Sequence, residues 1–355
     1  MYKYFKIVAN TAVGRRRYLK LLIPQVLASD IVDRYDLWVN TLDKIDIAYF
    51  EAMAEEFPKL NLIWQPKGII NGIYSIADFY PMCREENTIY IKLDDDVVWL
   101  EPDFFEKICR FRVENPHYFL VSPLVINNGI CNYLLQATGK IEFTKTHPCQ
   151  PYELPFYNGF LAEQLHEWFI GNYLKTGNFK QLYCGKHEIS LQRFAINTVA
   201  WFGNEFAKFD GHVVGDDEEF LTLSYPANNG LTHCFDCQTI VSHFSFSAQR
   251  EYLDQTDILN LYEEIILNQK EESVKKIFIK GNEILSQVES EAISILQKPI
   301  PHGYRSGTNQ NKRKFLKNLA LHFIAKMFGM PQNHLASIIQ TFFMLKKSQQ
   351  DYIKR

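Results

Sequence analysis

The chain has 355 residues, of which 46% are hydrophobic and 22% are charged. A chain of this length and apolar content can bury one large core or two smaller ones, which excludes full-length disorder. Residues 301–355 carry 10 Lys and Arg and one acid, whereas the rest of the chain carries 28 Lys and Arg against 40 Asp and Glu. An acidic body with a basic tail suggests that the body binds a cation, such as a metal, and that the tail meets an anionic surface.

Strands and helices alternate along the first 125 residues. The predicted strands are Phe5–Ala9, Asp36–Asn40, Leu60–Gln65, Thr88–Leu93 and Tyr118–Val125, and the predicted helices are Arg17–Ala28, Ile45–Phe57, Ile73–Cys83 and a helix from Pro102 to about Val113. Strands separated by helices of roughly 10–15 residues are typical of βαβ units. We therefore predict an α/β fold with a mostly parallel central sheet.

The rest of the chain begins less regularly. Residues 126–190 are rich in Asn, Gly, Pro and Tyr, which predicts an irregular insert that lines a site. Periodicity resumes at residue 190, and the pattern then predicts a helix near Gly215–Glu219, a strand over Thr239–Phe246 and amphipathic helix over residues 255–296. A polar linker follows residue 299, and the tail beyond it is helical again.

The seven cysteines are odd in number and irregularly spaced, which predicts free thiols in a reducing compartment. Cys234 and Cys237 form a lone CxxC, for which small thiols in a buried strand are a simpler interpretation than a zinc site. We expect no signal peptide and no membrane-spanning helix, because no apolar run of the required length exists. A cytoplasmic protein is the resulting expectation.

Three consecutive aspartates follow the predicted strand Thr88–Leu93. Asp94, Asp95 and Asp96 end an apolar run, and apolar residues resume at once. In an open α/β sheet, ligands bind beyond the carboxyl ends of the strands. Adjacent carboxylates repel one another and call for a compensating cation, and hard oxygen ligands suit Mn²⁺ or Mg²⁺. The alternative is a solvated acidic turn that caps a helix.

Two further features have simple interpretations when each is taken alone. The acidic run from Asp216 to Glu219 opens a predicted helix, where acids interact favourably with the helix dipole. His243 lies in an apolar strand-like run, where a histidine is more often a hydrogen-bonded core residue than a ligand.

In this order along the chain, the features resemble metal-dependent glycosyltransferases of the GT-A fold. Those enzymes bind a nucleotide-sugar on a Rossmann-like half and carry a DxD motif after a strand, where Asp94-Asp95-Asp96 stands here. Residues 215–220, GDDEEF, resemble the family's G-E-D-x-D-L motif with Asp for Glu, Glu for Asp and Phe for Leu. The stretch Asn10–Arg15 looks like the nucleotide-facing loop of bacterial surface-polysaccharide and lipopolysaccharide transferases. The resemblance covers about residues 4–255.

The resemblance implies a role for each matching acid. Asp96 would ligate the Mn²⁺ or Mg²⁺ ion, and His243 would be a further ligand. Asp94 would contact the donor's ribose or sugar, directly or through the ion, and Asp95 would be a secondary partner. Asp217 would take the proton from an acceptor hydroxyl, with Glu218 as the competing base.

The resemblance also implies a donor site on the first half of the chain. Arg250 would counter the diphosphate charge, although it could equally pair with a surface acid. The other implied nucleotide-binding positions are Thr11, Gly14, Arg15, Asn40 and Asp43. Residues 1–125 would form the nucleotide-sugar half, 126–255 the acceptor side, 256–300 a helical extension and 301–355 a basic tail.

The implied reaction is transfer of a sugar, with inversion, from a nucleoside diphosphate donor to a hydroxyl of a glycan or glycolipid. A UDP-sugar is the expected donor. Two other functions remain open: a metal-dependent nucleotidyltransferase or phosphohydrolase, and a non-catalytic glycan-binding protein. Basic and apolar residues alternate over residues 311–328, which predicts contact with an anionic membrane surface or a helix docked on the body or a partner. We expect no nucleic-acid partner, because the body is acidic.

Overall fold

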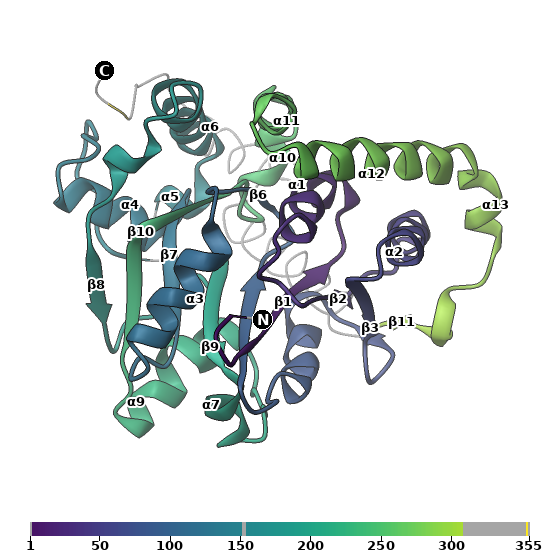
Figure 1. Cartoon of the computed structure of the whole chain (residues 1–355), viewed down its shortest axis with the longest axis horizontal. Helices are drawn as coiled ribbons and strands as arrows, with labels where there is room; N and C mark the ends of the chain where they lie inside the picture. Colours follow the sequence, from purple (N-terminus) through teal and green to yellow (C-terminus); the bar gives the residue numbers. More distant parts are fainter. Residues whose placement is uncertain (1, 151–153, 308–352, 354–355) are drawn as a thin grey trace, which may run out of the picture.

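A nine-stranded sheet forms the centre of the computed structural model, which describes residues 2–150, 154–307 and 353 (Figure 1). Its strands are β1 (Lys6–Val13), β2 (Arg34–Val39), β3 (Leu60–Trp64), β5 (Thr88–Leu93), β6 (Val97–Leu100), β7 (Val121–Ile126), β8 (Lys186–Ile189), β9 (Thr198–Phe202) and β10 (His233–His243). A second, small sheet pairs β4 (Ile69–Ile70) with β11 (Arg305–Ser306).

The strand order of the large sheet is β3-β2-β1-β5-β9-β7-β10-β6, and β8 pairs with β10. Strands β1, β2, β3, β5, β7 and β10 run in one direction, and β6, β8 and β9 run in the other. The parallel order β3-β2-β1-β5 is the arrangement of a Rossmann-like nucleotide-binding half. The predicted α/β class with a mostly parallel sheet is therefore confirmed.

The strand directions decide where the polar loops lie. Because β1, β2, β5, β7 and β10 are parallel, the residues that follow them meet at one edge of the sheet. The segment before β9 reaches the same edge, since β9 runs antiparallel to β5. Beyond this edge lie Gly14 and Arg15, Asn40, the three aspartates after β5, Asn127 and His243.

The helices cover the sheet in layers (Figure 1). They are α1 (Arg16–Leu27), α2 (Lys44–Glu56), α3 (Phe104–Glu114), α4 (Gly129–Ala137), α5 (Leu154–Tyr157), α6 (Gly159–Phe169), α7 (Gly203–Ala207), α8 (Asp217–Glu219), α9 (Tyr225–Asn229), α10 (Arg250–Leu253), α11 (Ile258–Asn268), α12 (Glu272–Ser290) and α13 (Ala292–Gln297). Short 3₁₀ or π segments are η1 (Gly72–Met82), η2 (Ile170–Leu174), η3 (Phe179–Leu182), η4 (Phe220–Ser224) and η5 (Pro301–Gly303). Helices α11 and α12 pack against α1, and the predicted C-terminal helical extension is thus present.

The prediction of an irregular insert over residues 126–190 is wrong. Most of its described residues belong to helices, with β8 near its end. Two of the Asn side chains that suggested loops are helix caps. Asn128 accepts hydrogen bonds from the first backbone N–H groups of α4, and Asn158 does the same for α6.

The described part of the predicted linker, from residue 299 to residue 307, also has structure. Arg305 and Ser306 pair with β4, and the rings of His302 and Tyr304 pack on Trp64. The membrane-surface prediction for residues 311–328 lies outside the described residues. Within those residues, no helix is both long enough and apolar enough to cross a membrane.

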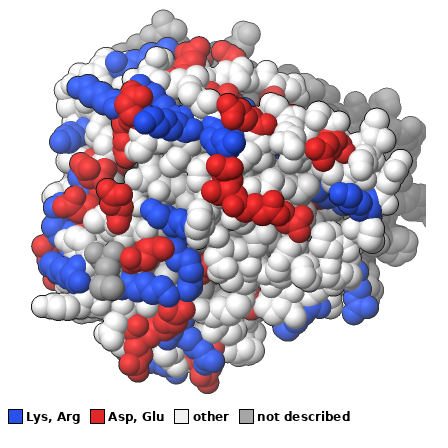
Figure 2. All heavy atoms as spheres, turned by 45° about the vertical axis from the view of Figure 1, so that its right-hand side comes forward, with Lys and Arg blue, Asp and Glu red and all other residues white. Residues whose placement is uncertain are grey.

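Charge is mixed over the face that includes α12 and α13 (Figure 2). Lys and Arg side chains lie among Asp and Glu side chains there, and neither sign covers the visible face. The acidic excess of the body is therefore not gathered into one field on this side of the molecule.

Candidate active site and metal centre

The three aspartates form the tight connection between β5 and β6. The backbone N–H of Val97 donates to the carbonyl of Asp94 at 3.1 Å, and the N–H of Asp94 donates to the carbonyl of Asn197 at 2.8 Å. Asp95 and Asp96 are buried, whereas the side chain of Asp94 is 29% exposed. The solvated acidic turn considered as an alternative is thus excluded for two of the three carboxylates.

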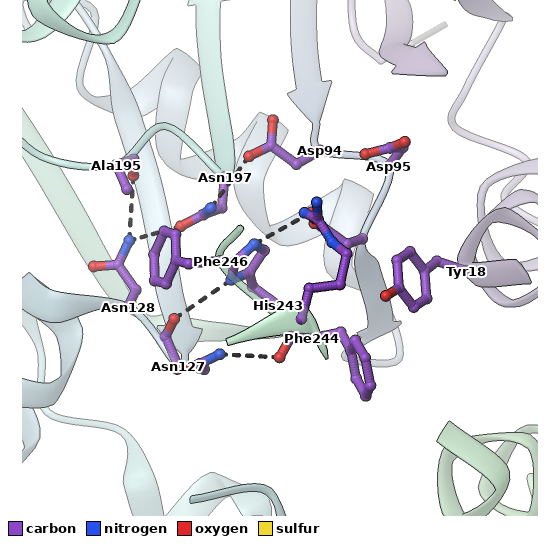
Figure 3. Close-up of polar contacts among 12 residues, drawn as sticks. Tyr18, Asp94, Asp95, Asn127, Asn128, Ala195, Asn197, His243, Phe244 and Phe246 are labelled. Carbon is purple, nitrogen blue, oxygen red and sulfur yellow. Dashed lines mark hydrogen bonds and ion pairs between the residues drawn. The ribbon is translucent and has the colours of Figure 1, made fainter. Parts of the chain in front are cut away.

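Asp94, Asp96 and His243 converge from two strands. Each side chain offers one ligand atom, and these atoms all lie within 4.8 Å of one another. His243 Nε2 lies 3.2 Å from Asp96 Oδ1, while Nδ1 donates to the carbonyl of Asn127 at 3.4 Å (Figure 3). With its Nδ1 proton on a carbonyl, the ring keeps Nε2 facing the carboxylates, as metal-binding histidines do.

Protein cations already compensate the acidic turn. Arg15 forms a bidentate pair with Asp95 and lies 3.0 Å from Asp96 Oδ2, and Arg250 donates to the same Oδ2 at 3.1 Å. Burial acts to raise the pKa of Asp96, but Arg15, His243 and Arg250 together hold it well below its usual range. The pKa of Asp95 is raised to about 6, because burial outweighs the effect of Arg15. A metal is therefore not needed to balance these charges, contrary to the simple repulsion argument.

The second acidic motif divides its side chains among different tasks. Asp216 caps α8 by accepting from the Glu219 backbone N–H at 3.2 Å. Asp217 is buried and accepts a hydrogen bond of 2.8 Å from the Tyr80 hydroxyl. Glu218 accepts from Arg193 Nε at 2.8 Å. Burial raises the pKa of Asp217 despite Lys92 and Tyr80, and it raises that of Glu218 to about 7 despite Arg193.

Lys92 joins the two acidic motifs. Its ammonium group is buried in β5, forms a short pair with Asp94 and donates to the carbonyl of Ile196 at 3.1 Å. Burial acts to lower the pKa of Lys92, but the charges of Asp94 and Asp217 raise it. The charges of Asp94 and Asp217 thus both act on one lysine. The aspartate turn after β5 and the acidic run that opens α8 therefore lie on the same side of the molecule.

The positions expected to face a nucleotide have mixed surroundings. Thr11 does not follow the first strand, because β1 extends to Val13; its hydroxyl is buried against the Tyr35 hydroxyl at 2.9 Å. A Cβ on Gly14 would lie 3.7 Å from the Asn40 carbonyl and 3.9 Å from Asp95 Oδ2, so this glycine adjoins the acidic turn.

Asn40 and Asp43 both have local partners. Asn40 donates to the Gly72 carbonyl at 3.0 Å and accepts from Ser75 at 2.7 Å. Asp43 caps α2 through the backbone N–H groups of Ile45 and Asp46. Both residues lie at the expected edge of the sheet, but their side chains are already used in hydrogen bonds that hold the loop and cap α2.

Several polar residues around the turn have no role in the sequence-based prediction. Asn197 donates to Asp94 Oδ2 at 3.1 Å and its own oxygen accepts from Asn128 at 2.8 Å (Figure 3). Tyr80 and Arg193 hold Asp217 and Glu218 from segments far away in the chain. Only Lys92 gives a signal in the sequence, as a lysine inside an apolar strand.

Comparisons with known proteins give weak likenesses. No protein-family model and no curated protein sequence matches the chain. Solved structures that align with it include a mycobacterial protein, with a TM-score of 0.41 and 11% identity over 75% of this chain and 74% of that one. A second is CMP:2-keto-3-deoxy-manno-octonic acid synthetase complexed with CTP, with a TM-score of 0.40 and 11% identity over 73% of this chain and 99% of that one. A third is S. aureus TarS, with a TM-score of 0.37 and 9% identity over 81% of this chain and 75% of that one. Likenesses this low carry no argument about activity.

Proposed function

We propose that this protein is a divalent-metal-dependent transferase that moves a sugar from a nucleoside diphosphate donor to a hydroxyl of a glycan or glycolipid. A UDP-sugar is the donor that we expect. One observation carries the proposal. Ligand atoms of Asp94, Asp96 and His243 converge beyond the carboxyl ends of β5 and β10, beside two arginines. That edge of an α/β sheet is where nucleotide ligands bind.

The donor set suits a divalent ion of intermediate hardness. Two carboxylates and one imidazole favour Mn²⁺, and Mg²⁺ is accepted through the oxygens. Asp94, Asp96 and His243 would hold the ion. When bound, such an ion neutralises negative charge on the diphosphate as it leaves the sugar.

Arg15 and Arg250 would serve the donor's phosphates. In the structure both arginines occupy Asp96 Oδ2, so they compete with a metal for this carboxylate. A diphosphate offers each guanidinium an alternative partner of matching geometry. Donor binding would then release Asp96 to the ion, which makes binding of metal and nucleotide cooperative.

The buried carboxylate of Asp217 is our proposed general base. It shares the electrostatic surroundings of Asp94 through Lys92, and its hydrogen bond with Tyr80 fixes its direction. A base needs a pKa near the working pH, and burial shifts Asp217 in that direction. Glu218 stays the competing candidate, because its pKa is raised to about 7. Asp217 would take the proton of the acceptor hydroxyl while the hydroxyl oxygen bonds to the anomeric carbon on the face opposite the leaving diphosphate, and such a displacement inverts that carbon.

The remaining assignments rest on the resemblance described under the sequence. Residues 1–125 would bind the donor, with Gly14 leaving the backbone after β1 open to it and with Asn40 and Asp43 beside the base and ribose. The buried Thr11 and Asp95 would support this region through Tyr35 and Arg15. Residues 126–255 would bind the acceptor. If the basic segment 311–328 binds an anionic membrane surface, a lipid-linked acceptor would lie on the same membrane.

Product analysis tests this function against its main rival. The protein is incubated with Mn²⁺ and a panel of nucleotide-sugars, and in parallel with nucleoside triphosphates and sugar phosphates. We expect release of a nucleoside diphosphate from at least one nucleotide-sugar, faster with Mn²⁺ than with EDTA and abolished in Asp96→Asn. Pyrophosphate release from a triphosphate and a sugar phosphate would instead show a nucleotidyltransferase and overturn the proposal.

A further inference from the structure

A second group of metal-ligating side chains lies near the β8 edge of the sheet. Cys184, His187 and Cys237 each offer one ligand atom, and all three atoms lie within 4.8 Å of one another. Cys184 and His187 belong to the sequence Cys-Gly-Lys-His, and Cys237 lies on β10. In a tetrahedral zinc site with Zn–S bonds of about 2.3 Å, ligand atoms are about 3.8 Å apart, so only a small closure would be needed.

The backbone holds the two sides of this group together. The Cys184 N–H donates to the Cys237 carbonyl at 3.2 Å, and the Cys237 N–H donates to the Gly185 carbonyl at 2.8 Å. Cys237 follows the last residue of β10 that pairs with β8, where the β10–β7 register also shifts. Such irregularities redirect a side chain, here toward the neighbouring Cys184.

The backbone fixes one ring nitrogen of His187. Its Nε2 lies 2.9 Å from the Cys184 carbonyl, which can only accept, so Nε2 carries the proton. Nδ1 then keeps a lone pair, which is what an imidazole nitrogen needs in order to bind a metal. A backbone carbonyl that fixes the opposite nitrogen is the usual second partner of a zinc-bound histidine.

Neither cysteine of the group is used in a disulfide. All seven cysteines are free, so no disulfide occupies Cys184 or Cys237. A thiolate is the form of cysteine that binds metals.

We propose that Cys184, His187 and Cys237 bind one zinc ion that fastens β8 to β10. Two thiols and an imidazole are soft and borderline ligands, which select zinc over the Mn²⁺ or Mg²⁺ proposed for the carboxylate site. Binding displaces the thiol protons to solvent. Cys184 and His187 are half-buried, so a water molecule completes the four ligands. The zinc ligands proposed here are not those of the CxxC motif, because Cys237 belongs to the ligand group and Cys234 does not.

This site would stabilise an edge that has little other support. Strand β8 has four residues and alternates exposed with half-buried side chains, and among the described strands it pairs only with β10. Strand β10 continues from Cys237 to His243, so the zinc would also hold the strand that carries a proposed ligand of the other metal. The inference does not depend on the proposed transferase activity.

The test is the zinc content of the reduced, purified full chain, measured by mass spectrometry of the metal. We expect about one zinc per chain, lost in Cys184→Ser and in Cys237→Ser. Cys109→Ser, which alters a buried thiol outside the group, and Asp96→Asn, which alters the carboxylate site, should keep it. A chelator should lower the melting temperature of the wild type and leave that of Cys184→Ser unchanged.

A spectroscopic measurement on the wild type avoids dependence on variants that fold poorly. Reconstitution with Co²⁺ should give the intense near-ultraviolet absorption of cobalt–thiolate bonds. A reduced wild-type chain that binds neither zinc nor cobalt would overturn the proposal. Recovery of a Cys184–Cys237 disulfide from such a chain before reduction would show that the pair is a redox couple instead. Equal zinc content in the two serine variants and the wild type would also contradict the site.

Discussion

At the scale of single residues, the acidic turn combines negative charge with an almost complete set of internal partners. Arg15 binds Asp95, Arg15 and Arg250 bind Asp96, and Lys92 binds Asp94. Removing one member of a buried charged pair leaves the other uncompensated, which is expensive in free energy. The turn is therefore preorganised before any ligand arrives, and a ligand has to exchange partners rather than build a site.

The proposed base leads to a prediction about pH. Asp217 accepts a proton only when ionised, and burial raises its pKa, so kcat/KM should rise with pH as this group loses its proton. Asp217→Asn should lower kcat by roughly 100- to 10,000-fold and remove this acidic limb. The measurement is the pH profile of nucleoside diphosphate release with a saturating acceptor.

Glu218→Gln is the matched control, because it removes the neighbouring carboxylate and keeps a hydrogen-bond acceptor for Arg193. It should lower kcat less than tenfold and leave the acidic limb in place. If Glu218→Gln removes the limb and Asp217→Asn preserves it, Glu218 is the base and our assignment is wrong. Melting temperatures of both variants equal to that of the wild type would show that neither effect comes from unfolding.

At the scale of elements, the position of Asp217 depends on how η1 packs against the loop before α8. Tyr80, the hydrogen-bond donor to Asp217, lies in η1. Gly211 has φ +65°, and a Cβ there would lie 2.5 Å from the Tyr80 carbonyl oxygen. Gly230 has nearly the same φ, +62°, with no atom within 4 Å of an added Cβ. Comparing substitutions at the two glycines therefore distinguishes the cost of a positive φ from the cost of a steric clash with η1.

Alanine substitutions at these glycines should therefore differ. Gly230→Ala should lower the free energy of unfolding by about 1–2 kcal/mol, the cost of a left-handed backbone. Gly211→Ala should lower it by a further ~1–3 kcal/mol, because η1 must move, and should also reduce activity through Tyr80. Urea denaturation measures both free energies. Equal destabilisation by the two substitutions would show that η1 does not rest on Gly211.

The same scale shows what could be predicted from the sequence and what could not. The strand ending at Leu93 and the aspartates after it follow from a local pattern, and this part of the fold is confirmed. The extension of β1 to Val13 has no such pattern, because polar Asn10 and Thr11 are buried by pairing with β2. Arg193 and Tyr80 reach the site only through tertiary packing, which a local pattern cannot indicate. The helices of residues 126–190 were missed because asparagine favours both loops and helix caps.

At the scale of the whole molecule, the site is assembled where parallel strands end. The β1 and β5 ends bring Arg15 and the aspartates, and the β10 end brings His243 from more than a hundred residues further along the chain. Residues that are far apart in the chain therefore share one site. Loss of either contribution, that of the aspartates after β5 or that of His243 on β10, should abolish metal-dependent ligand binding even if the fold is kept.

Calorimetric titration with UDP and GDP tests this central claim most directly. We predict that the wild-type protein binds one of these nucleotides in Mn²⁺ and binds it about 100-fold more weakly in EDTA, a difference of about 2.7 kcal/mol. Asp96→Asn should bind as weakly as the EDTA-treated protein, whereas Asp210→Asn, at an exposed aspartate that pairs with Arg84, should match the wild type. An affinity for UDP and GDP that is the same with and without Mn²⁺, or that is unchanged in Asp96→Asn, would contradict the account.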